Sequence, residues 1–127
     1  LDTCLSCYFQ NFTRGHAYTD DLESLAHHYN YYRDLMAQWH EALPISIHDI
    51  VYEQLVSDPE QRIPQLVETC GLTFEPQCLD FHETRRSVRT ASVTEVRRAV
   101  YTSSVDKWKH YEQQLRPLIQ ALDSRAG

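Results

Sequence analysis

A single stretch of the sequence, residues 45–52 ("ISIHDIVY"), is typical of a β-strand, whereas the segments on both sides of it are typical of helices. The stretch is short, mostly apolar and rich in β-branched residues, which favours an inner strand of a parallel sheet over an exposed edge strand. One strand cannot satisfy its own backbone N–H and C=O groups, and the rest of the sequence supplies no partner strand. Either the segment is not a strand, or the other strands of its sheet precede Leu1.

The segments before this stretch have the apolar spacing of amphipathic helices. One helix is predicted over residues 2–12. A longer helix over residues 20–42 should begin with a capping box formed by Asp20 and Glu23, and Pro44 should end it. Its predicted apolar stripe consists of Leu22, Leu25, Tyr29, Tyr32, Met36 and Trp39.

The segments after the stretch also predict helices. Asp58 followed by proline is a helix start and Gly71 is a helix stop, so a helix is expected between them. A short helix is expected over residues 76–82. The last helix should be capped by Ser104, with an apolar stripe of Trp108, Tyr111, Leu115, Leu118 and Leu122.

The composition is that of a single soluble globular domain: 127 residues, 42% apolar, with a formal net charge of -6. No run approaches the roughly 18 apolar residues of a membrane span, and no signal peptide is visible, so a cytoplasmic location is expected. The acidic balance disfavours nucleic acid as a partner. Cys4 and Cys7 have CxxC spacing, but no second close pair accompanies them, so no metal site is expected.

Positive charge is concentrated in one region of this acidic chain, residues 85–109. The region contains seven basic and only two acidic residues, a net charge of +5, around a run of serine and threonine. We name it the basic island. Residues 83–91 show no apolar periodicity and should form a loop, and Ser92 with Glu95 should cap a short helix.

The basic island admits three interpretations. The free N–H groups at a helix start capped by Ser92, together with Arg97, Arg98 and Lys107, would suit a bound phosphate or phosphosulfate. Alternatively, Ser92 only caps a helix and the arginines are solvated. The third interpretation takes Ser87 and Ser92 as kinase sites, because both follow basic residues.

The order of several motifs resembles the C-terminal half of a sulfotransferase that uses 3′-phosphoadenosine 5′-phosphosulfate (PAPS). The motifs are "CLSCYFQNF", "IVYEQLVSDPE", "CGLTFEPQCLDFH" and "RTASVTEVRRAVYTSSVDKWKHYE". The sequence is most similar to the bacterial tetratricopeptide-repeat-associated branch, which is related to the protein-tyrosine sulfotransferases. The resemblance implies an α/β fold like that of P-loop kinases, with this chain as its mostly helical C-terminal part carrying about one parallel strand.

The resemblance also implies the residues of a PAPS site. Ser6 matches a serine that binds the 3′-phosphate, Tyr52 a tyrosine that contacts the nucleotide, and Lys107 a lysine on the 3′-phosphate side. Residues 92–101 match a loop that closes over the phosphates, in which Ser92 would also stabilise charge in the transition state. The cofactor-binding residues implied in that loop are Ser92, Thr94, Val96, Arg97, Arg98 and Tyr101.

The implied activity is transfer of a sulfuryl group from PAPS to a hydroxyl or amine acceptor, leaving adenosine 3′,5′-bisphosphate. Gln10 and Ala99 stand where the tyrosine-sulfating relatives have Arg and Pro, and the family's phosphosulfate loop and catalytic base do not occur in these 127 residues. We therefore expect residues 1–127 to be the C-terminal portion of one sulfotransferase domain. They would not be competent alone, and an N-terminal half or tetratricopeptide repeats would be their partners. A non-catalytic binding domain and a phosphorylated helical adaptor are the alternatives.

Overall fold

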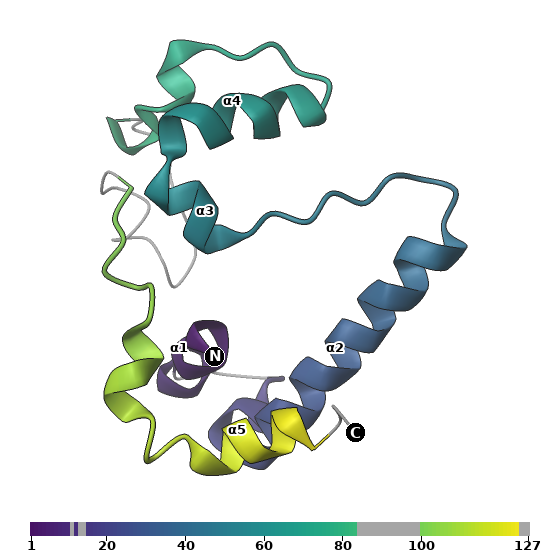
Figure 1. The fold of residues 1–127 in the computed structure, drawn as a ribbon, viewed down its shortest axis with the longest axis vertical. Helices are drawn as coiled ribbons and strands as arrows, with labels where there is room; N and C mark the ends of the chain where they lie inside the picture. Colours follow the sequence, from purple (N-terminus) through teal and green to yellow (C-terminus); the bar gives the residue numbers. More distant parts are fainter. Residues whose placement is uncertain (11, 13–14, 84–99, 125–127) are drawn as a thin grey trace. The chain divides into compact units, whose positions relative to one another are not determined.

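The computed structural model describes residues 1–10, 12, 15–83 and 100–124 (Figure 1). The chain divides into two compact units. The first unit consists of Leu1–Ile47 and Ser104–Gly127, so it joins the two ends of the chain, and the second unit is His48–Ser103.

The first unit is a small helical assembly. Its α-helices are α1 (Asp2–Phe9), α2 (Leu22–Ala42) and α5 (Arg116–Asp123), and its 3₁₀ helices are η1 (Ala17–Asp20) and η5 (Lys107–Tyr111). The side chains that pack between them are apolar and almost fully buried: Cys4, Leu5, Leu25, Ala26, Leu115 and Leu118. Burial raises the pKa of the Cys4 thiol, so Cys4 packs as a neutral core residue.

The apolar stripe predicted for α2 is buried near the start of the helix and more exposed toward its end. Leu25 is buried, and Leu22 and Tyr29 pack against the core cluster. Farther along the helix, Tyr32 and Trp39 are 50% and 44% exposed. The helix itself spans the predicted length and ends two residues before Pro44, with Leu43 in extended backbone, as expected for the residue before a proline.

The N-terminus of α2 is capped by Asp21, one residue later than predicted. The Ser24 backbone N–H donates to Asp21 Oδ2 at 2.7 Å, and this hydrogen bond lowers the pKa of the Asp21 carboxyl. Asp20 instead ends η1. The capping box of Asp20 and Glu23 was therefore wrong in register, because η1 occupies the residues just before the helix.

Replacing Asp21 with Ala should destabilise the first unit at neutral pH, because the ionised carboxylate caps α2. A carboxyl whose pKa is lowered by folding contributes stability above its unfolded pKa of about 3.9, and this stability is lost as the pH falls through the lower folded value. The difference in melting temperature between wild type and Asp21→Ala should therefore shrink below about pH 4. Thermal unfolding followed by circular dichroism measures it. Asp20→Ala is the matched control, and an equal effect of both variants would contradict the cap assignment.

The predicted C-terminal helix is divided into two pieces. Asp106 has a left-handed backbone (φ 61°) before η5, and four turn residues separate η5 from α5. Pro117 lies in the first turn of α5, where its missing N–H costs no hydrogen bond. The prediction of one continuous helix from Ser104 was therefore wrong. The predicted apolar stripe is confirmed, since Leu115 and Leu118 are buried and Trp108, Tyr111 and Leu122 pack against them.

The second unit contains α3 (Tyr52–Ser57), α4 (Pro59–Thr69) and the 3₁₀ helices η2 (Pro76–Cys78) and η3 (Phe81–Glu83). The predicted helix from Asp58 is confirmed as α4, with Asp58 at the N-cap. Gly71 follows α4 with φ 73°, a conformation in which glycine avoids the strain of a side chain. The predicted short helix over residues 76–82 is present as two separate 3₁₀ turns.

No strand occurs in the part of the chain that the structure describes, so the strand predicted over residues 45–52 is wrong for this chain. Residues 46–51 have no regular structure, and Tyr52 begins α3. The physical reason is the missing partner, because an extended segment without a neighbouring strand forms no ladder of hydrogen bonds. The loop predicted over residues 83–91 and the short helix predicted from Ser92 lie largely outside the described residues, although Glu83 is described and ends η3. None of the described helices is long and apolar enough to cross a membrane.

Candidate functional site

The predicted site residues fall into three groups in the structure. Ser6 and Lys107 belong to the first unit, and Tyr52 and Tyr101 belong to the second. The other predicted residues lie outside the described part of the chain: Ser92, Thr94, Val96, Arg97 and Arg98.

In the first unit, α1 and η5 lie side by side although about a hundred residues separate them (Figure 1). The Asp2 carboxylate joins them. The Asp106 backbone N–H donates to Asp2 Oδ2 and the Trp108 backbone N–H donates to Asp2 Oδ1, each at 2.8 Å. Both oxygens of one carboxylate therefore bind the backbone on either side of Lys107.

A second contact joins the far ends of the same two elements. The rings of Phe9 and Tyr111 meet edge to face, with centroids 5.2 Å apart. Asp2, Ser6 and Phe9 are spaced i, i+4 and i+7, so they share one face of α1. Ser6 is therefore on the face of α1 that η5 lies against, between the two contacts, and its side chain remains exposed.

The two lysines of η5 have different surroundings. Lys109 Nζ lies 2.7 Å from Asp106 Oδ2, in an exposed ion pair. Lys107 is exposed and forms no ion pair with any residue in the described ranges. Of the two lysines of η5, Lys107 is therefore the one whose charge is not offset by a carboxylate in the described ranges.

In the second unit, Tyr52 is the first residue of α3 and is 46% exposed, and Tyr101 is half-buried. A cavity of about 230 Å³ lies beside the start of α3. Tyr52 does not line it, although Val51 does. Its polar lining residues are His48, Asp49, Gln54, Arg62, Gln65 and Thr69.

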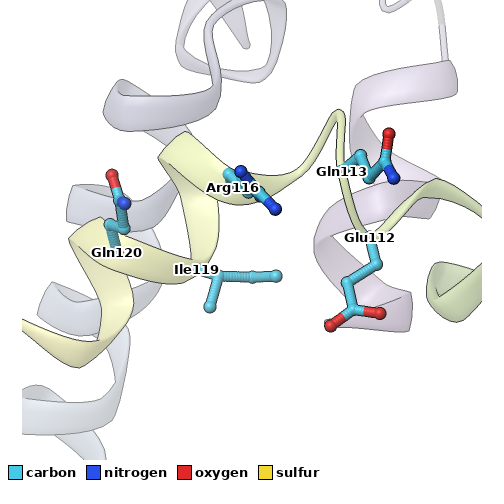
Figure 2. A pocket seen from close by; sticks show the side chains of 5 residues that line it. All are labelled: Glu112, Gln113, Arg116, Ile119 and Gln120. Atoms are coloured by element: carbon cyan, nitrogen blue, oxygen red, sulfur yellow. The ribbon is translucent and has the colours of Figure 1, made fainter.

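A larger cavity of about 410 Å³ lies in the first unit, at the junction of α5 with the turn before it (Figure 2). Arg116, Ile119 and Gln120 project from α5, and Glu112 and Gln113 project from the turn. Glu112 offsets the charge of Arg116, so the cavity has no net positive charge. None of the predicted site residues lines it.

Sequence reasoning missed the contact of Asp2 with the backbone around Lys107. An acidic residue in the first turn of a helix is ordinary, because it interacts favourably with the helix dipole. Nothing in the sequence near Asp2 or near Lys107 signals that the carboxylate binds the backbone on both sides of the lysine. The contact depends on α5 and α2 bringing the two ends of the chain together.

The fold and the α1–η5 contact define a helical domain with an exposed lysine held beside its N-terminal helix. The sulfotransferase family model matches residues 1–76, a range that includes Ser6 and Tyr52. The chain belongs to the sulfotransferase family. An uncharacterized protein of Aquifex aeolicus (strain VF5) is 39% identical over 125 residues, or 96% of this chain, and the chain spans 16% of that relative's length. No solved structure matches the chain significantly.

Proposed function

We propose that the protein is a PAPS-dependent sulfotransferase of the branch related to the protein-tyrosine sulfotransferases. It would transfer a sulfuryl group from PAPS to a hydroxyl or amine acceptor and release adenosine 3′,5′-bisphosphate. Residues 1–127 would form the C-terminal portion of the domain and carry the 3′-phosphate side of the PAPS site. The phosphosulfate side would come from elsewhere in the complete protein, within the same domain.

The observation that carries this proposal is the contact of α1 with η5. Family membership alone supports sulfuryl transfer in general. The resemblance to the PAPS-dependent enzymes implies that Ser6 and Lys107, 101 residues apart, bind the same phosphate group. Two contacts hold their elements together, from Asp2 and from Phe9. A hydroxyl, and an ammonium group with no ion-pair partner among the described residues, lie on adjoining elements and suit a phosphate dianion, which accepts charge-assisted hydrogen bonds.

The remaining residues have roles that follow from the chemistry. Sulfuryl transfer, like phosphoryl transfer, depends mainly on positioning and on stabilising charge that develops on oxygen. Tyr52 would contact the nucleotide. The loop of residues 92–101 would close over the phosphates, with Arg97 and Arg98 supplying positive charge and Ser92 donating to the transferred group.

Adenosine 3′,5′-bisphosphate is expected to raise the melting temperature of the complete protein, with a rise that grows with ligand concentration. Adenosine 5′-monophosphate differs by the absence of the 3′-phosphate, so it should produce a smaller rise if that phosphate is recognised. Differential scanning fluorimetry with both nucleotides measures the difference. Equal shifts, or no shift with either nucleotide, would contradict the proposal.

A further inference from the structure

Among the described residues, Asp2 ties the backbone on both sides of Lys107 to another element. Its two carboxylate oxygens accept from Asp106 N–H and Trp108 N–H, each at 2.8 Å. Hydrogen bonds to an ionised acceptor are stronger than neutral ones, and a pair from one rigid carboxylate also fixes orientation. The Cα atom of Lys107 is therefore held from both sides against the first turn of α1.

The conformation of Asp106 shows why this segment needs such a tie. Among the non-glycine residues that the structure describes, only Asp106 has a left-handed backbone, at φ 61°. This conformation costs an L-residue free energy, so it persists only where surrounding contacts hold it. The hydrogen bond from Asp106 N–H to Asp2 Oδ2 ties this backbone to α1, whereas the exposed ion pair of the Asp106 side chain with Lys109 Nζ contributes little free energy.

We propose that Asp2 is a positioning residue that holds Lys107 beside Ser6, ready to bind the 3′-phosphate. This inference rests on the proposed function, because it takes adenosine 3′,5′-bisphosphate as the ligand of Lys107. Asp2 itself carries negative charge and would not bind the phosphate. Asp2 would raise affinity indirectly, by holding the backbone of Lys107 in place before the ligand binds. Binding of the phosphate by Lys107 then does not include the free-energy cost of ordering that backbone.

A purely structural Asp2 would behave differently in one measurable respect. It would stabilise the fold, and its loss would weaken binding by the same factor whether or not Lys107 is present. A positioning residue loses its effect once the lysine side chain is removed. Affinity for adenosine 3′,5′-bisphosphate in a double-mutant cycle therefore separates the two roles.

The test uses the complete protein with Asp2→Ala, Lys107→Ala and the double variant, and measures the dissociation constant by isothermal titration calorimetry. Asp2→Ala alone should weaken binding of adenosine 3′,5′-bisphosphate by about tenfold, and the double variant should bind about as weakly as Lys107→Ala. Asp2→Asn keeps the size of the side chain and one acceptor oxygen, so it should recover part of the loss. The same cycle is run with Asp2→Asn if Asp2→Ala does not fold.

The outcomes distinguish the two proposals. If the wild type binds and the losses from Asp2 and Lys107 multiply independently, the positioning role is overturned and the proposed function stands. If the wild type does not bind adenosine 3′,5′-bisphosphate at all, the proposed function is overturned, and this inference falls with it. Coupled losses with partial recovery in Asp2→Asn support the inference.

Discussion

Lys107→Ala is expected to weaken binding of adenosine 3′,5′-bisphosphate by about 10- to 100-fold. A hydrogen bond to a charged partner contributes about 1.5–3 kcal/mol, and each 1.4 kcal/mol is a factor of ten in affinity. Lys107 is exposed and forms no ion pair within the described ranges, so its removal leaves no partner charge unsatisfied in the free protein. The loss should therefore be seen in binding and not in the melting temperature.

Lys109→Ala is the matched control for this prediction. Lys109 lies on the same 3₁₀ helix and carries the same charge, but its ammonium group is 2.7 Å from the Asp106 carboxylate. Its removal should change affinity by less than about threefold, because exposed ion pairs contribute little free energy. Titration calorimetry at two salt concentrations measures both variants. Equal losses would show that only the general positive charge of the region matters, and would remove Lys107 from the site.

Local patterns in the sequence predicted α2 and α4 well, but they predicted neither α3 nor the break between η5 and α5. The apolar spacing of α2 and the proline that follows it gave its length, and Asp58 with Gly71 gave the limits of α4. Such signals depend on nearest neighbours along the chain. The errors occurred where a neighbouring element competes, as at Asp21, where η1 precedes the helix and moves the cap by one residue.

The predicted strand shows a different limit. Residues 45–51 have the composition of a buried strand, yet Ile45, Ile50 and Val51 are 66%, 48% and 49% exposed. The composition of a segment indicates the environment, buried or exposed, in which its side chains are most stable. A strand also requires a partner backbone within hydrogen-bonding distance. No described residue supplies that backbone, so the composition alone was not sufficient.

The candidate site was only partly predictable. Resemblance assigned Ser6 and Lys107 to one phosphate, and the structure independently places their elements side by side. The hydrogen bonds that fix the arrangement span 104 and 106 residues, a separation at which spacing rules carry no information. The left-handed conformation of Asp106 was equally hidden, because an Asp residue fits many conformations.

Leu118→Ala is expected to destabilise the first unit by about 3–5 kcal/mol. Leu118 is fully buried between α5 and α2, and removing its side chain loses transfer free energy and leaves a cavity in a small core. Total stabilities of small domains are only about 5–15 kcal/mol, so a large part of the folding free energy is at stake. Loss of the α5 packing should also release η5, because Leu115, at the start of α5, donates its N–H to the Tyr111 carbonyl.

Urea denaturation followed by tryptophan fluorescence measures this change, because both tryptophans, Trp39 and Trp108, belong to the first unit. Ile45→Ala is the matched control within the same unit. It removes three carbon atoms, as Leu118→Ala does, from a side chain that is 66% exposed, and should change the free energy of unfolding by less than about 0.5 kcal/mol. If Leu118→Ala were as mild as Ile45→Ala, α5 would not be packed on α2. The packing of α5 on α2 would then not explain how Lys107 comes to lie beside α1.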